Sequence, residues 1–165
     1  MQSLSTLEQR FANQPERMLD IGVARALGIQ FRSGYNILHF YQLREQMLRA
    51  NGPERLDTLK QLNAIVREEL EQNKVLLALC EKDSRLGFHS EAEGYKYFPE
   101  KIRWRMKQLQ NVLADDFPAV ERQILNKESL FPAYTGLKPE GPVARAVPSN
   151  YAVWTSTKFA PPAGV

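Results

Sequence analysis

The most regular pattern in the chain is an apolar stripe at helical spacing that runs from residue 53 to about residue 81. The stripe consists of Leu56, Leu59, Leu62, Ile65, Val66, Leu70, Val75, Leu76 and Leu79. The predicted opposite face is charged and holds Glu68, Glu69, Glu71 and Lys74. Asn51-Gly52-Pro53 is a turn with proline near the first helical position, so we expect a helical rod of roughly 45 Å to begin there.

Two helical segments are predicted before this rod. Apolar spacing from Leu4 to Leu27 indicates helix, with Pro15 starting a second helix and Gly28 as its C-terminal cap. A further helix is expected from Ser33, as N-cap, to Arg49. Its sequence YNILHFYQLREQML is unusually aromatic, and a face this broadly apolar predicts packing on two sides.

The C-terminal third changes character twice. Pro99 is expected to start a helix that Asp115 and Asp116 break, and a short helix should follow with Pro118 near its start. Six of the ten prolines lie between positions 132 and 162, where no helix fits. Within that region NYAVWTSTKF has the composition of a short strand.

These patterns predict an all-α fold. We expect an antiparallel helical bundle or array of four to six helices, with an extended, Pro-rich C-terminal tail. The expected division is a helical domain over residues 1–130 and a tail or linker over residues 131–165.

Composition narrows the possible partners and compartment. The 165 residues have a formal net charge of +3, which is too small to predict a nucleic-acid surface. Lys101, Arg103, Arg105 and Lys107 spread over more than one helical face, which favours ion pairs and a solvated surface. The single Cys80 lies in an apolar run and is expected to be buried and inert.

No signal peptide or membrane span is predicted from the sequence. The chain is therefore expected to be cytoplasmic if it is complete, and exported if it is a fragment of a secreted parent.

The connecting segment DSRLGFHSEAEGYKY, residues 83–97, is too rich in charged and aromatic residues for a plain linker. Rings that cover a pyranose, beside charged groups that bind its hydroxyls, are typical of a sugar-binding surface. The candidate ligand-binding residues are Arg85, Phe88, His89, Glu91, Glu93 and Tyr95. The alternative is structural: the aromatic residues pin the segment to the bundle while Asp83 and Arg85 satisfy backbone groups at helix ends.

The usual signatures of catalysis and cofactor binding are not found in the sequence. Its two histidines are not at a metal-ligand spacing, so no metal or other cofactor is predicted. Glu91 and Glu93 are two residues apart on one short segment, whereas a glycosidase needs carboxylates on opposite sides of the scissile bond. No catalytic residue is predicted.

The segment LCEKDSRLGFHSEAEGYKYFPEKIRWRM resembles the C-terminal helical region of large bacterial glycoside-hydrolase-like proteins, including relatives of α-glucuronidases. In those proteins a D-S-R-[LI]-G-[FY]-x-[SA]-[EN] segment joins two helices beside a TIM-barrel catalytic domain. The similarity runs from about Phe31 to Leu113. The tail VARAVPSNYAVWTSTKF resembles the linker and opening strand of a family-9-type carbohydrate-binding module.

The resemblance implies a non-catalytic accessory helical domain of a carbohydrate-active protein. Such a domain would dock to a catalytic domain of the same or another chain, or form a homodimer through its aromatic helices, and it would contribute to a sugar cleft. An exposed apolar patch is expected for it. The alternative is a free-standing interaction module that binds a protein partner along residues 51–81. A third reading is a glycoside hydrolase in which Glu91 or Glu93 meets Glu68, Glu69 or Glu71.

Overall fold

The computed structural model describes residues 2–86, 88–89, 94–95 and 98–132, and within them it is all-α. The chain divides into two compact units, Met1–Leu130 and Phe131–Val165, and all the described helices belong to the first. The expected strand NYAVWTSTKF and most of the expected Pro-rich tail lie outside the described residues.

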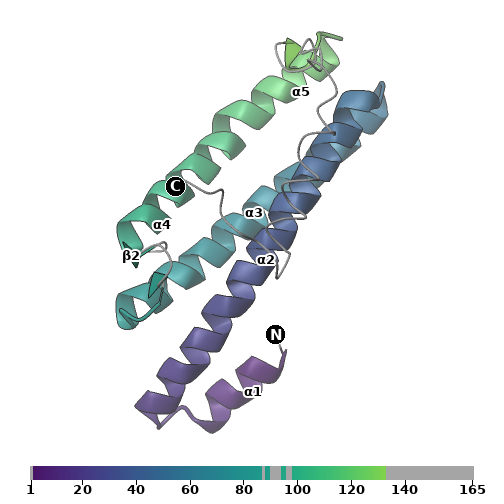
Figure 1. Cartoon of the computed structure of the whole chain (residues 1–165). Helices are drawn as coiled ribbons and strands as arrows, with labels where there is room; N and C mark the ends of the chain where they lie inside the picture. The colour runs from purple at the N-terminus through teal and green to yellow at the C-terminus, as the bar shows by residue number, and fades with distance from the viewer. Residues whose placement is uncertain (1, 87, 90–93, 96–97, 133–165) are drawn as a thin grey trace, which may run out of the picture. The chain divides into compact units, whose positions relative to one another are not determined.

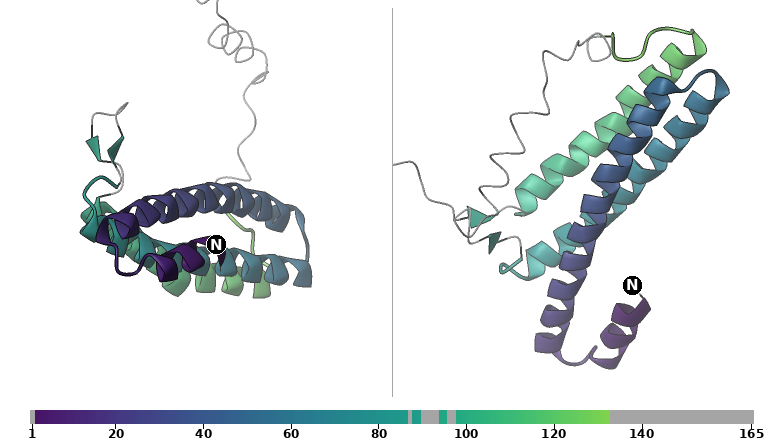
Figure 2. Two further views of the ribbon diagram at one scale, coloured as in Figure 1. Left: turned by 90° about the horizontal axis from the view of Figure 1, so that it is seen from below. Right: turned by 45° about the vertical axis from the view of Figure 1, so that its right-hand side comes forward.

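Three long helical segments lie side by side and alternate in direction (Figures 1 and 2). The first is α2, Pro15–Arg49, and the second is α3, Pro53–Lys82, which contacts both of the others. The third is built from α4, Pro99–Asn111, a π-helical turn at Val112–Asp116 and α5, Phe117–Leu125. A short helix, α1, Gln2–Arg10, packs on α2, where Glu8 pairs with Arg25 at 2.9 Å.

Proline opens each of the three long helical segments, as predicted for Pro15, Pro53 and Pro99, and Pro118 lies near the start of α5, also as predicted. Proline is well suited to the first turn, because the N–H it lacks would have no partner there. Gly52 has a φ of +56° in the turn between α2 and α3, a conformation that glycine adopts without strain. The connections are therefore encoded locally, by the residues at the turns themselves.

Two predicted helix boundaries are wrong. Gly28 is not a C-terminal cap and Ser33 is not an N-cap, because α2 continues through both residues. Each interior glycine costs helix stability of the order of 1 kcal/mol. Tertiary packing outweighs this cost, since Ala26, Ile29 and Ser33 are all buried along the inner side of α2.

The predicted break at Asp115 and Asp116 is also wrong. The backbone remains helical there but widens into a π turn, in which Phe117 N–H donates to Val112 O. Pro118 gives a physical reason, because it has no N–H and its ring would clash with the carbonyl of Ala114 in a regular α-helix. The helix therefore continues with one loosened turn where the sequence pattern predicted two separate helices.

The core has two hydrophobic clusters, one toward each end of the bundle. One joins α2, α3 and α5 and contains Leu43, Met47, Leu59, Leu62, Ile65, Val66, Phe117, Val120, Ile124 and Leu130. The other joins α2, α3 and α4 and contains Ala26, Ile29, Leu76, Cys80, Leu86 and Ile102. Cys80 is buried as predicted, and burial raises the pKa of its thiol.

A buried polar cluster lies between these two clusters along the helices. The carboxylate of Glu69 on α3 accepts hydrogen bonds from Ser33 Oγ at 2.8 Å and Asn36 Nδ2 at 2.9 Å, both on α2. It also accepts one from Arg105 Nη2 on α4 at 2.6 Å, and the same Nη2 donates to Ser33 Oγ at 2.9 Å. Asn73 Nδ2 donates to the backbone carbonyl of Glu69 at 2.7 Å. One carboxylate therefore connects all three long helical segments.

The sequence pattern predicts Glu69 on the charged, solvated side of the rod, and that prediction is wrong. Its side chain is only 6% exposed, whereas the side chain of the adjacent Glu68 is 37% exposed and pairs with Arg32 on α2 at 2.8 Å. The two glutamates follow each other in sequence, but only the second faces the interior. They form a matched pair for mutagenesis.

We predict that Glu69→Gln lowers the free energy of unfolding by about 2 kcal/mol, because it removes the buried carboxylate charge that compensates the half-buried Arg105. Glu68→Gln is the control and should cause a clearly smaller loss, because its ion pair is partly solvated. Urea unfolding followed by circular dichroism measures both. Equal losses from the two substitutions would contradict the central role of Glu69.

Candidate functional site

The predicted ligand segment begins with a structural turn. Asp83 ends α3, and its Oδ1 accepts hydrogen bonds from the backbone N–H of Arg85 at 3.0 Å and from Arg85 Nε at 2.9 Å. Arg85 Nη2 donates to Asp83 Oδ2 at 2.6 Å. The Asp-Ser-Arg sequence thus closes a tight Asx-type turn on itself, which is the structural alternative raised for these two residues.

This turn positions Leu86 in the core. Leu86 N–H donates to the carbonyl of Asp83 at 3.2 Å, and the side chain is buried in the cluster with Cys80 and Ile102. The guanidinium of Arg85, which was predicted to contact ligand, is held against the Asp83 carboxylate. These hydrogen bonds lower the pKa of Asp83, although burial opposes the effect.

The remaining predicted ligand residues lie in or around a small hairpin. Strand β1, Phe88–His89, pairs in antiparallel fashion with β2, Gly94–Tyr95, so that Phe88 is opposite Tyr95 and His89 is opposite Gly94. Glu91 and Glu93 fall outside the described residues. The hairpin brings the backbones of Phe88, His89 and Tyr95 together.

The carboxylates proposed as partners of Glu91 or Glu93 all have other contacts. Glu68 accepts two hydrogen bonds from Arg32, which lower its pKa, and Glu69 is held in the buried cluster. Glu71 pairs with Lys74 at 2.6 Å. On the basic helix, Arg103 pairs with Glu81 and Arg105 with Glu69, so ion pairs account for two of its four cations.

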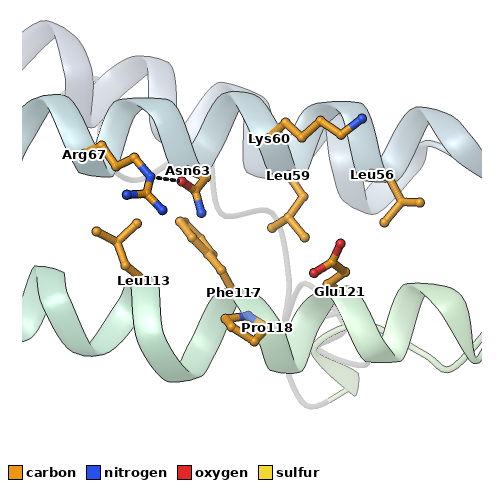
Figure 3. Close-up of a pocket in the computed structure, with 9 residues that line it drawn as sticks. All are labelled: Leu56, Leu59, Lys60, Asn63, Arg67, Leu113, Phe117, Pro118 and Glu121. Carbon is orange, nitrogen blue, oxygen red and sulfur yellow. Dashed lines mark hydrogen bonds between the residues drawn. The ribbon is translucent and has the colours of Figure 1, made fainter.

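A pocket of about 380 Å³ lies between α3 and the segment that contains the π turn (Figure 3). Its lining residues are Leu56, Leu59, Lys60, Asn63, Arg67, Leu113, Phe117, Pro118 and Glu121. Arg67 Nε donates to Asn63 Oδ1 at 2.6 Å, and Lys60 pairs with Asp57 at 3.0 Å. The pocket shares no residue with the predicted ligand segment, and its two cations already have partners within α3.

The most prominent surface feature is on α2. Nine uncharged residues on the side of α2 away from α3 form what we term the outer face: Ala24, Leu27, Gly28, Phe31, Gly34, Tyr35, Leu38, Tyr41 and Gln42. All nine are exposed, and the large side chains are strongly so, with Phe31 at 78% and Leu38 at 73%. Among the described residues only the inner side of this aromatic helix is buried, so the second contact that was predicted for it is not made within them.

Arginines border the outer face without interrupting it. At 100° per residue, Arg25, Arg32 and Arg44 project to its flanks. The guanidinium of Arg32 lies 4.9 Å from the ring centroid of Tyr35, and that of Arg44 lies 4.9 Å from the centroid of Tyr41. These cation–π contacts hold the two tyrosines at the edges of a continuous, largely apolar strip about five turns long.

The sequence contains a signal for this surface. Leu27, Phe31, Gly34, Leu38 and Tyr41 follow a 4-3-4-3 spacing, the repeat of a helix that packs against a partner helix. A second set, with Ala26, Ile29, Leu43 and Met47, faces α3. Two apolar sets on one helix predict two contacts, but the described residues supply only the inner one.

Comparison of the chain with models of known protein families, with curated proteins and with solved structures finds no match. The resemblance to glycoside-hydrolase-like proteins therefore stays a prediction.

Within the described ranges, no group of three or more His, Cys, Asp or Glu side chains is arranged to hold a metal ion. In the same residues, no helix combines the length and apolar character needed to cross a bilayer.

The Asp83–Arg85 turn predicts a specific pH dependence for Arg85→Gln. Because Arg85 lowers the pKa of Asp83 below its ordinary value of 3.8, the turn stabilises the fold above that pH. Protonation of Asp83 removes this stabilisation as the pH falls through the lowered pKa. The wild type should therefore exceed the variant in stability by a constant amount from about pH 5 to 7, and this difference should shrink below about pH 4.

Urea unfolding at a series of pH values measures this difference. The Arg32–Glu68 pair is present in both proteins, so its own titration cancels in the comparison. A difference that stays constant down to the lowest pH would contradict the assigned role of Arg85.

Proposed function

We propose that the chain is a non-catalytic helical docking domain that binds another protein molecule through the outer face of α2. The observation that carries this proposal is the outer face itself. It displays Leu27, Phe31, Leu38 and two tyrosines to solvent, although the inner face of the same helix already builds the core. Contiguous exposed apolar surface of this kind typically marks an interaction site.

The position of α3 supports α2 as the docking helix. The apolar stripe of α3 contributes Leu59, Leu62, Ile65, Val66 and Leu76 to the two core clusters. Because that stripe is packed against the neighbouring helices, a partner that bound along residues 51–81 would meet mainly the polar side of the rod. The outer face of α2 is the larger apolar surface available among the described residues.

A carbohydrate role remains a proposal that rests on the sequence resemblance. The side-chain contacts of Arg85 are those of a structural turn, and Glu91 and Glu93 fall outside the described residues. Docking through the outer face does not depend on whether the partner acts on sugars.

Site-specific photo-crosslinking in cells that express this chain tests the docking proposal. Benzoylphenylalanine in place of Leu38, on the outer face, should yield covalent adducts of defined mass after irradiation. The same residue in place of the exposed Gln61 on α3 is the control and should yield few or none. Adducts formed equally from both positions, or from neither, would contradict docking through α2.

A further inference from the structure

We propose that the outer face of α2 binds the outer face of a second copy of this chain, with the two α2 helices antiparallel. The two-fold axis would pass between Gly34 and Tyr35, so that residue i faces residue 69 − i of the second copy. This inference rests on the proposed docking function and adds the identity and orientation of the partner. Isologous pairing of one patch with itself is the commonest way in which soluble chains oligomerise.

The most exposed apolar side chains of the outer face meet at the centre of this arrangement. Phe31 faces Leu38 of the second copy, which joins the two most exposed large side chains of the helix.

The charges at the two ends of the outer face select the antiparallel orientation. Asp20 and Arg49 are both exposed and project along the same line as Leu27 and Phe31, at opposite ends of the strip. Antiparallel pairing places Asp20 of each copy opposite Arg49 of the other, and Glu45 opposite the small Ala24. Parallel pairing would instead place Asp20 against Asp20 and Arg49 against Arg49, which repel.

A charge exchange tests the orientation directly. Asp20→Arg puts two arginines together at each end of the dimer, and Arg49→Asp puts two aspartates together. Each single variant should weaken dimerisation of the full chain by about tenfold. The double variant restores both ion pairs with reversed polarity and should recover the wild-type dissociation constant. Sedimentation equilibrium of the purified chain over a range of protein concentrations measures all four proteins.

Two further variants separate association through α2 from general changes of charge or folding. Glu71→Lys reverses an exposed charge on α3 and should leave dimerisation unchanged. Leu38→Glu should weaken the dimer by about a hundredfold, because it places a charge in each half of the apolar strip, while the circular dichroism spectrum stays that of the wild type.

The outcomes distinguish this inference from the docking proposal. A wild-type chain that stays monomeric at the highest concentration overturns the second copy as partner, and so does a double variant no better than the single variants. If adducts from position 38 then contain a different protein and no dimer, docking through α2 stands and only the identity of the partner fails. A chain that neither dimerises nor forms adducts at position 38 overturns both.

Discussion

The arrangement of the bundle depends on the carboxylate of Glu69. It lies where α2, α3 and α4 meet, and it accepts hydrogen bonds from Ser33, Asn36 and Arg105. Sliding any of the three helices by one turn would separate these groups and leave a buried charge without compensation, at a cost of several kcal/mol. The hydrophobic clusters on either side would tolerate such a shift better, because apolar contacts are not directional. The polar cluster therefore sets the alignment of the helices, while the apolar clusters supply most of the stabilisation.

Because hydrogen bonds align the helices and the apolar clusters stabilise them, α2 can have small or polar residues on its inner side and aromatic residues on its outer face. Its inner side includes the small or polar residues Ala26, Ser33 and Asn36, all of which are buried. Its larger aromatic side chains lie mainly outside, where the packing within the described bundle does not require them. A helix whose inner contacts are fixed by hydrogen bonds can carry an apolar outer strip without ambiguity about which side faces the core.

Local features of the sequence predicted much of the fold, because a residue such as proline determines the backbone conformation at its own position. Pro15, Pro53 and Pro99 marked the helix starts correctly, since a missing N–H has its effect at one position. The errors arose where distant residues decide the outcome. Gly28 and Ser33 have the local character of helix ends, but packing against α3 keeps both inside a helix. Glu69 has the local character of a solvated residue, but it is buried beside Arg105, which is 36 residues further along the chain.

The candidate site was harder to predict than the fold, for the same reason. The segment around Arg85 attracted attention by its composition, yet Arg85 itself closes a turn with Asp83. The outer face of α2 was visible as a heptad spacing, but the inner apolar set overlapped with it in sequence. Only the burial of each residue separates the two sets, and burial follows from which face meets α3.

The connectivity of the bundle has a consequence for its synthesis. The α2–α3 hairpin leaves the ribosome before α4, so the Glu69 carboxylate has no cation beside it until Arg105 has been made. The contacts that align α2 and α3 with the rest of the bundle are therefore complete only when α4 has been made. Because neighbouring segments in the chain are also neighbours in the bundle, this last step needs little search, and folding should then be rapid and cooperative.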